Sequence, residues 1–285
     1  IFFLDHGKRL GRVYDAFNTR WFRSSFEGFG YEPLPHAQDQ IQTAIKDICL
    51  SLKSEDWFDL EKPIIRPIYV DLPPEARRQY REMERKMFTE IKEHPIEAFN
   101  AGARTQKLLQ MAAGAVYLGS PDDAGPRQWT EVHQAKLDAI EEIVEEAAGM
   151  PILLGYNYKH DLARILKRFP KAVHFSNKAG ITERWNKGEI PILVSHPGSM
   201  GHGLSLQKGS NILARFSSDW NNEQFEQMLE RIGPVRQAQS GLHRNVFDYR
   251  VIARDTIDED VYESHASKRA VQDVLMEGLS RRLSS

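Results

Sequence analysis

The 285-residue sequence is poor in cysteine and in long apolar runs. Its single cysteine, Cys49, excludes an internal disulfide and any zinc site built from several cysteines. No apolar run approaches the roughly 20 residues that span a bilayer, and the apolar residues 1–4 are too few for the core of a signal peptide. These absences predict a protein of the reducing cytoplasm that has no membrane segment.

Two glycine-rich signatures of nucleotide enzymes are also missing. The sequence has no Gly-x-x-x-x-Gly-Lys-Ser/Thr phosphate loop, and residues 155–158 do not supply the Gly-x-Gly-x-x-Gly of a dinucleotide enzyme. The acidic residues 258–260 superficially resemble a magnesium-binding box. Because they open a helical pattern, we interpret them as first-turn charges that complement the helix dipole.

The overall charge is nearly balanced. There are 38 lysines and arginines against 40 aspartates and glutamates, which gives a formal net charge of −2. This balance argues against attraction of nucleic acid to the whole surface, so any DNA contact must be a local patch. The 41% hydrophobic and 27% charged residues are ordinary for a soluble globular protein.

Strands and helices alternate in the second half of the chain. Short connections between them predict an α/β fold with a parallel sheet covered by helices on both faces. The expected strands are 152–156, 172–175, 192–195, 211–216 and 246–253, and the expected helices are 133–148, 161–169, 182–187 and 258–279.

The first part of the chain is expected to be mostly helical. Its aromatic and basic residues before position 60 favour a small core with exposed arginines over a surface that stacks bases. We place the domain boundary between residues 128 and 129, after the clearest linker. The expected helices are 40–52, 75–93 and 98–117, the expected strand is 64–72, and the linker is 120–126.

The stretch from 192 to 237 is the functional centre of the sequence. An apolar strand passes into a turn in which Gly201 and Gly203 let the backbone approach a phosphate or a nucleic-acid strand. After a second apolar run, a polar helix carries Arg231, and Arg236 follows. Two arginines beyond a strand favour a polyanionic ligand.

The order of these motifs resembles the Swi/Snf-type, superfamily-two helicase-like ATPases, most of all their phage and prophage branch. In that family the last motif reads Gln-x-x-x-Arg-x-x-Arg-x-Gly-Gln, whereas here Pro234 stands at the second arginine and Arg236 lies two residues later. A proline there is expected to break the helix, so that Arg236 reaches the site from a turn. The matching residues are Gly201–Leu206, Asp219–Asn221, Gln227-x-x-x-Arg231, Leu72–Pro74 and Lys136-Leu137.

The resemblance implies a fold and a function. Residues 129–285 correspond to the RecA-like C-terminal lobe of a helicase, and residues 1–128 to the end of the first motor lobe and a helical insertion. The full protein is expected to be a hydrolase that uses ATP and Mg, bound mainly by a missing N-terminal lobe, to act as a helicase or translocase on double- or single-stranded DNA. Because it lacks the phosphate loop, this fragment alone is expected to hydrolyse little ATP.

The resemblance also implies roles for individual residues. Arg231 and Arg236 would neutralise charge on the γ-phosphate, while Gln227 orients nearby groups. Gly201 and Gly203 would shape the nucleotide loop. Hydroxyl and amine groups at strand ends would contact DNA, and they belong to Ser195, Ser199, Tyr156 and Lys159.

Other interpretations remain open from the sequence. The same fold would serve a non-catalytic nucleic-acid-binding module that uses no nucleotide. Arg231 would then form a structural ion pair with Glu230 or Asp219, and Tyr156 and Lys159 would be ordinary loop surface. His196 and His202 flank the glycine-rich turn, but with no third ligand nearby they predict no metal site.

Overall fold

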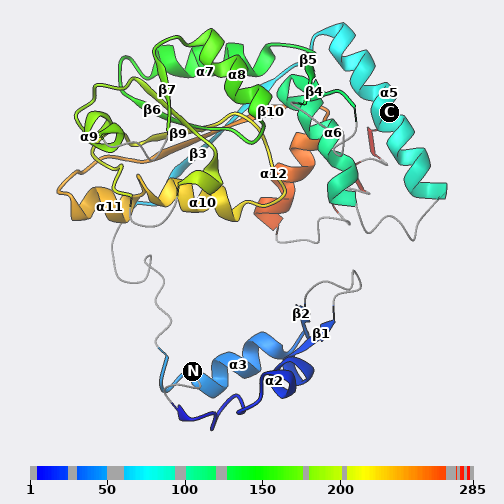
Figure 1. Cartoon of the computed structure of the whole chain (residues 1–285), viewed down its shortest axis with the longest axis vertical. Coiled ribbons are helices and arrows are strands. Elements are labelled where there is room, and N and C mark those ends of the chain that lie inside the picture. Colours follow the sequence, from blue (N-terminus) through cyan, green and yellow to red (C-terminus); the bar gives the residue numbers. More distant parts are fainter. Residues whose placement is uncertain are drawn as a thin grey trace. The chain divides into compact units, whose positions relative to one another are not determined.

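The computed structural model describes residues 5–24, 31–49, 61–93, 101–119, 127–175, 180–200, 204–267, 274, 277–278 and 281–282. The chain divides into two compact units, Ile1–Asp59 and Leu60–Ser285 (Figure 1). No helix in the described ranges is both long enough and apolar enough to cross a membrane.

The N-terminal unit is small. Its buried aromatic residue is Trp21, which is 2% exposed and carries the guanidinium of Arg20 at 4.6 Å from its ring centroid. This burial confirms the predicted core role for that tryptophan. The unit contains α2 (Tyr14–Trp21), α3 (Ala37–Ile45) and an antiparallel pair of strands, β1 (Phe22–Ser24) and β2 (Tyr31–Pro33).

The larger unit is organised around a six-stranded parallel sheet, as the alternation of strands and helices predicts. The strand order is β3-β10-β9-β6-β8-β7, and all five pairings are parallel. The strands are β3 (Ile64–Val70), β6 (Ile152–Gly155), β7 (Ala172–His174), β8 (Ile192–Ser195), β9 (Ile212–Arg215) and β10 (Phe247–Ala253).

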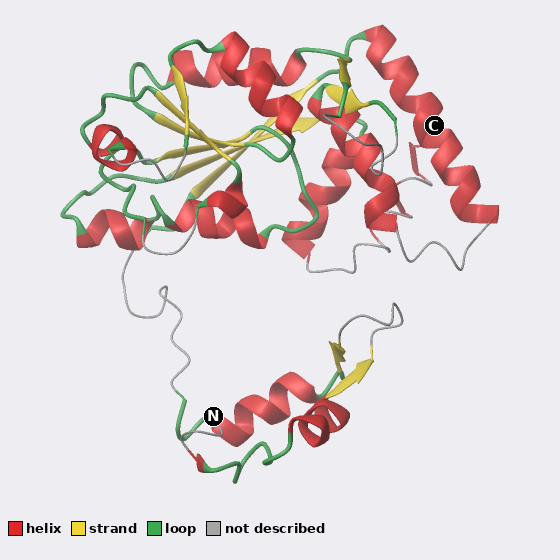
Figure 2. Cartoon of the chain, viewed as in Figure 1, coloured by secondary structure: helices red, strands yellow, loops and turns green. Residues whose placement is uncertain are grey.

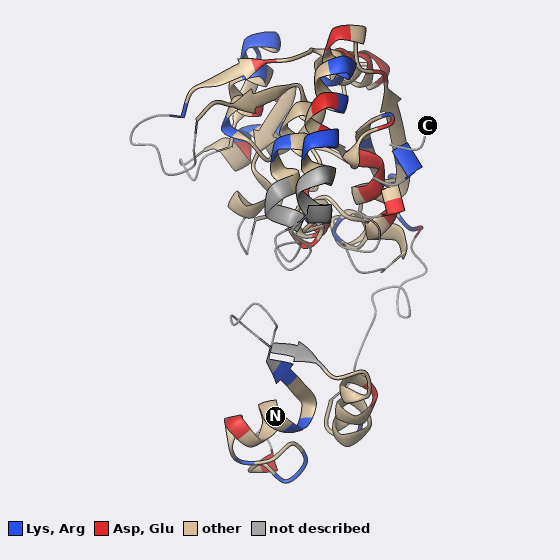
Figure 3. Ribbon diagram, turned by 90° about the vertical axis from the view of Figure 1, so that its right-hand side faces the viewer, with Lys and Arg blue, Asp and Glu red and all other residues tan. Residues whose placement is uncertain are grey.

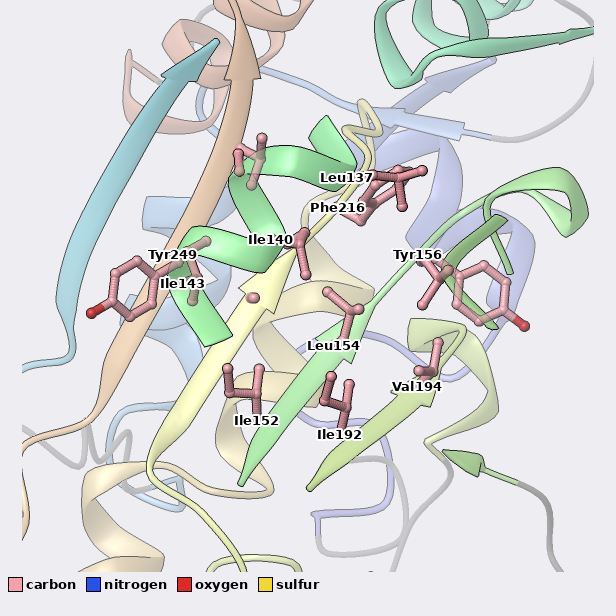
Figure 4. Packing of buried hydrophobic residues seen from close by; sticks show 14 of the residues in the cluster. Leu137, Ile140, Ile143, Ile152, Leu154, Tyr156, Ile192, Val194, Phe216 and Tyr249 are labelled. Atoms are coloured by element: carbon pink, nitrogen blue, oxygen red, sulfur yellow. The ribbon is translucent and has the colours of Figure 1, made fainter. Parts of the chain in front are cut away.

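Helices cover both faces of this sheet (Figure 2). Because side chains alternate along a strand, Ile152 and Leu154 of β6 face one side, whereas Leu153 faces the other. The first side packs against α7 (Ala135–Glu146) and α8 (Lys159–Arg168). Figure 4 shows Ile143 of α7 beside Tyr249 of β10, with the side chains of Leu154 and Val194 on the neighbouring strands β6 and β8. The second side packs against α9 (Ile181–Asn186) and α10 (Glu223–Glu230).

A helical layer adjoins the β3 edge of the sheet. Its core contains Tyr80, whose hydroxyl accepts a hydrogen bond of 2.8 Å from the backbone N–H of Ile257. Basic and acidic residues alternate along the ribbon of this unit, and neither sign is confined to one element (Figure 3). The layer consists of α5 (Pro74–Glu93), α6 (Ala101–Ala113), α12 (Ile257–Ser267) and the antiparallel pair β4 (Ala115–Tyr117) and β5 (Trp129–Glu131).

The prediction of one helix over 98–117 was wrong at its end. The helix stops at Ala113, and Gly114 turns the chain with a φ of +104° into strand β4. Glycine adopts such a φ without the steric penalty that a Cβ brings. The result is a β-hairpin-like pair beside the sheet that the apolar pattern of the helix did not reveal.

Candidate functional site

The candidate site is built on α10 and the short helix that follows it. Arg231 is the C-cap residue of α10, and Gly233 and Pro234 then start α11 (Pro234–Gln239) with proline in its first turn. The predicted break of the helix is confirmed. The expectation that Arg236 lies on a turn was wrong, since the proline begins a new helix that carries Arg236.

Arg231 is a buried cation without an ion-pair partner in the described part of the chain. Only 7% of the residue is exposed, and its Nε has no hydrogen-bond partner. The described residues give it no ion pair, either with Glu230 or with Asp219. Burial, together with the nearby charge of Arg236, lowers the pKa of its guanidinium, while Glu230 acts in the opposite direction. An unpaired buried charge is costly, so this arrangement is suited to an incoming anion.

Arg236 connects α11 to the segment after the glycine-rich turn. It is half-buried, and its Nη1 donates a hydrogen bond of 3.0 Å to the carbonyl of Leu204. The predicted nucleotide-loop residues Gly201 and Gly203 lie outside the described residues. Gln227 is exposed one turn before Arg231 on α10, and its amide donates to Glu223 at 3.1 Å.

The predicted DNA-binding residues lie at the carboxyl ends of neighbouring strands. In the register of β6 and β8, Gly155 pairs with Ser195, and the N–H of Tyr156 donates to the Ser195 carbonyl at 3.2 Å. The fold therefore brings these residues together, as expected for parallel strands. Ser199 and Lys159 are exposed at this edge.

Two of these residues are less accessible than the sequence predicts. Ser195 is fully buried and its hydroxyl donates to the His196 carbonyl at 3.0 Å, so in this conformation it cannot contact a DNA phosphate. Tyr156 is 6% exposed, and its hydroxyl lies 3.1 Å from Nε2 of His174. Both were expected at the ends of strands, with their side chains available to DNA. The structure places them at those ends, but the side chains are packed.

Comparisons with known proteins fit this geometry. No family model matches the chain. A phage protein, putative protein p41 of Acyrthosiphon pisum secondary endosymbiont phage 1, is 49% identical over 98% of this chain and 61% of its own length. The human DNA repair and recombination protein RAD54-like is 24% identical over 50% of the chain and 20% of its own length. The chain thus spans less than two thirds of the curated relatives that it matches.

Two solved structures share the fold. The C-terminal part of the Fun30 ATPase domain has a TM-score of 0.55 and 14% identity, and the match covers 79% of this chain and 99% of that one. The Sulfolobus solfataricus SWI2/SNF2 ATPase core in complex with dsDNA has a TM-score of 0.50 and 18% identity, over 96% and 58% of the two chains. The larger unit therefore shares its fold with the C-terminal part of the Swi2/Snf2-type ATPases.

A charged network that the sequence did not reveal fixes the start of α10. Arg215, at the end of β9, binds both carboxylate oxygens of Asp248 at 2.7 Å. The same guanidinium donates to Asn222 at 2.7 Å and to Glu226 at 3.0 Å. Arg250 also donates to Asp248, at 2.9 Å. Arg215 lies inside an apolar run, and nothing in the sequence pattern distinguished it.

A second hidden network joins α7 to α12. Lys136 and Asp258 are both fully buried, and the lysine Nζ lies 2.5 Å from the carboxylate. The lysine also donates to the carbonyl of Val251 at 3.0 Å, while Asp258 accepts the N–H of Ala253. Residues 258–260 do begin a helix, as predicted. Asp258 is a buried ion-pair partner there, in addition to any effect on the helix dipole.

The described residues contain no group of three or more histidines, cysteines and acids that is arranged to hold a metal ion. His196 is half-buried, and its Nδ1 accepts the N–H of Gly198 at 3.1 Å. His202 lies outside the described residues, so the prediction for this pair is not tested.

Proposed function

We propose that this chain forms the second lobe of an ATP-driven DNA translocase or helicase. Arg231 and Arg236 stabilise the γ-phosphate of an ATP that is held, with Mg, mainly by an N-terminal RecA-like lobe of the same protein. Residues 129–285 form most of the C-terminal lobe, whose sheet also takes in β3, and the rest of residues 1–128 contains the end of the first lobe and a helical insertion. Without the first lobe the chain hydrolyses little ATP.

The buried, unpaired guanidinium of Arg231 supports this proposal most directly. A structural arginine in a protein interior normally has a carboxylate partner, as Arg215 has in Asp248. Arg231 has none among the described residues, and the charge of Arg236 lies close enough to lower its pKa. Two neighbouring cations without a counter-charge fit a triphosphate, and an arginine that reaches a transferring phosphoryl group contributes roughly 10³ to 10⁵ in rate.

DNA is the proposed track. Lys159 and Ser199 are exposed at the carboxyl edge of the sheet, where parallel α/β folds hold their ligands. A solved neighbour with the same fold contains dsDNA. The glycine-rich turn 201–203 is proposed to couple the nucleotide to this DNA edge.

The test uses the full-length protein, with the N-terminal lobe present. Arg231→Lys keeps the positive charge but removes the planar fork that holds two oxygens at once, so DNA-stimulated kcat should fall by about 10² or more. Arg236→Lys, measured in parallel, shows which arginine acts on the phosphate. Arg184→Lys is the matched control, because Arg184 is 54% exposed on α9 and pairs only with Glu189 there.

The outcomes separate the alternatives. A loss of kcat with Arg231→Lys but not with Arg184→Lys, at an unchanged melting temperature, supports the proposal. If Arg231→Lys, Arg236→Lys and Arg184→Lys all hydrolyse ATP as fast as the native protein, neither Arg231 nor Arg236 acts on the nucleotide. Salt-dependent DNA binding that never responds to ATP would instead favour a non-catalytic binding module.

A further inference from the structure

We propose that the β4–β5 pair carries a second contact for the nucleic-acid backbone, beside the carboxyl edge of the sheet. The contact is a basic platform made of Lys107, Tyr117, Arg127 and Lys159, with Trp129 at its rim. It rests on the proposed function in that DNA is the polyanion. It adds a surface to which the sequence motifs assign no role.

The platform is built on a series of packed planar groups. The guanidinium of Arg127 lies 4.3 Å from the centroid of the Tyr117 ring. The Tyr117 ring packs at a tilt against His160, with centroids 4.7 Å apart, and Tyr158 stacks on His160 at 5.1 Å. His160 is fully buried, so the series is anchored in the protein interior. Stacking on a rigid ring holds the exposed guanidinium in place before any ligand binds.

Hydrogen bonds place the Lys107 ammonium and the backbone of Lys159 beside the same tyrosine. The hydroxyl of Tyr117 accepts the backbone N–H of Lys159 at 3.0 Å, and the Lys107 ammonium donates to the Tyr117 carbonyl. The Tyr158 hydroxyl donates to Gln106 at 3.0 Å, which fixes α6 against the loop after β6. Three basic residues, from α6, from the segment before β5 and from the start of α8, therefore contact one tyrosine.

No carboxylate in the described part of the chain pairs with Lys107, Arg127 or Lys159. Two arginines elsewhere on the same unit each have two carboxylate partners. Arg78 binds two glutamates on α5, and Arg168 binds Asp138 and Glu141. Burial and the charge of Arg127 lower the pKa of Lys107, which is the effect of like charges held together. A cluster of unpaired cations favours an anionic ligand.

The aromatic groups favour nucleic acid over an acidic protein as that ligand. Trp129 is 38% exposed in the strand that follows Arg127, so the platform combines cations with an exposed aromatic ring. This combination binds phosphates and stacks bases. Lys159 is also the first residue of α8, directly after the loop that follows β6. The platform therefore continues the proposed DNA edge, and a strand that passes Lys159 would reach Arg127.

The experiment measures the salt dependence of DNA binding by the full-length protein, with a labelled duplex and a labelled single strand of random sequence. The double change Arg127→Gln with Lys107→Gln should weaken binding on the order of tenfold at low salt. It should also reduce the slope of log K against log salt by about two, because each lost phosphate contact reduces the slope by about one. Arg127→Lys, which keeps the charge, should retain most of the slope.

Lys171→Gln is the matched control. Lys171 is exposed before the amino end of β7, at the opposite edge of the sheet, and no ion pair of it is described. If the native protein binds DNA and the double variant behaves like Lys171→Gln, the platform is overturned while the proposed function stands. If ATP hydrolysis ignores DNA but the double variant still lowers the slope, the platform stands and the proposed function fails. If the native protein binds neither the duplex nor the single strand, both the platform and the proposed function are overturned.

Discussion

The buried ion pair between Lys136 and Asp258 gives the sharpest test of how the parallel sheet and the helical layer are held together. Both side chains are fully buried, and the lysine also donates to the Val251 carbonyl at 3.0 Å. Lys136→Met keeps most of the aliphatic stem and removes the charge, so Asp258 is left as a buried carboxylate without its cation. Removing one partner of a buried pair costs roughly 3–5 kcal/mol of folding free energy.

Urea unfolding of the chain, followed by tryptophan fluorescence and circular dichroism, measures this loss. With a urea m-value of about 1–3 kcal/mol per molar, the midpoint should fall by at least about 1 M. The control is Arg78→Met, because Arg78 makes contacts of 2.7 and 2.6 Å with Glu75 and Glu82 but is 60% exposed. An exposed pair contributes only about 0–1 kcal/mol.

The double variant Lys136→Met with Asp258→Asn completes the cycle. The change Asp258→Asn removes the unpaired carboxylate charge and keeps an oxygen that accepts the N–H of Ala253. The double variant should therefore lose less stability than the sum of the two single variants. The reasoning is refuted if Lys136→Met costs no more than Arg78→Met, or if the two single losses simply add.

Three further predictions concern stability. Gly114→Ala should destabilise the fold by about 1 kcal/mol or more. The φ of Gly114 is +104°, and a Cβ there would lie 2.4 Å from the His133 carbonyl oxygen. An unchanged melting temperature would contradict this prediction. Arg215→Lys should lower the free energy of unfolding in urea by about 2 kcal/mol, because an ammonium cannot reach Asp248, Asn222 and Glu226 at once. A loss no larger than that of Arg184→Lys would rule out this role for Arg215. Burial lowers the pKa of His133 to about 4, so the folded state favours the neutral ring and stability is lost as pH falls from about 6.5 toward 4. Between pH 7 and 5 the native chain should lose roughly 2 kcal/mol more than His133→Gln, and equal losses would contradict the assignment.

The sheet was predictable because its strands are buried on both faces. Residues 152–155 and 192–195 are continuous apolar runs, which is the pattern of parallel strands between two helical layers. The place of β3 was not predictable in the same way. Its residues alternate as an edge strand does, but its pairing with β10 joins segments about 180 residues apart, and no local pattern encodes such a contact.

The features of the site that a sequence motif determines were predictable, and the exposure of its side chains, which depends on packing, was not. The break at Pro234 followed from the chemistry of proline, which has no N–H for the helix. The burial of the Ser195 and Tyr156 side chains did not follow, because a pattern that marks the end of a strand does not show whether its last side chain faces the core or a ligand. The Arg127 platform also depends on the third dimension, since its basic residues come from three segments that only the fold brings together.

The two buried arginines of this region show how the lobe separates positioning from binding. Arg215 has three acceptor side chains, two of which lie in the first turns of α10, so it anchors the amino end of that helix to the sheet. Arg231 ends the same helix and has no such partner. Counter-charges placed at the start of α10 hold the helix without neutralising the guanidinium at its end. A ligand that supplies negative charge there meets a cation that is already oriented, so little of the binding energy is lost in ordering it.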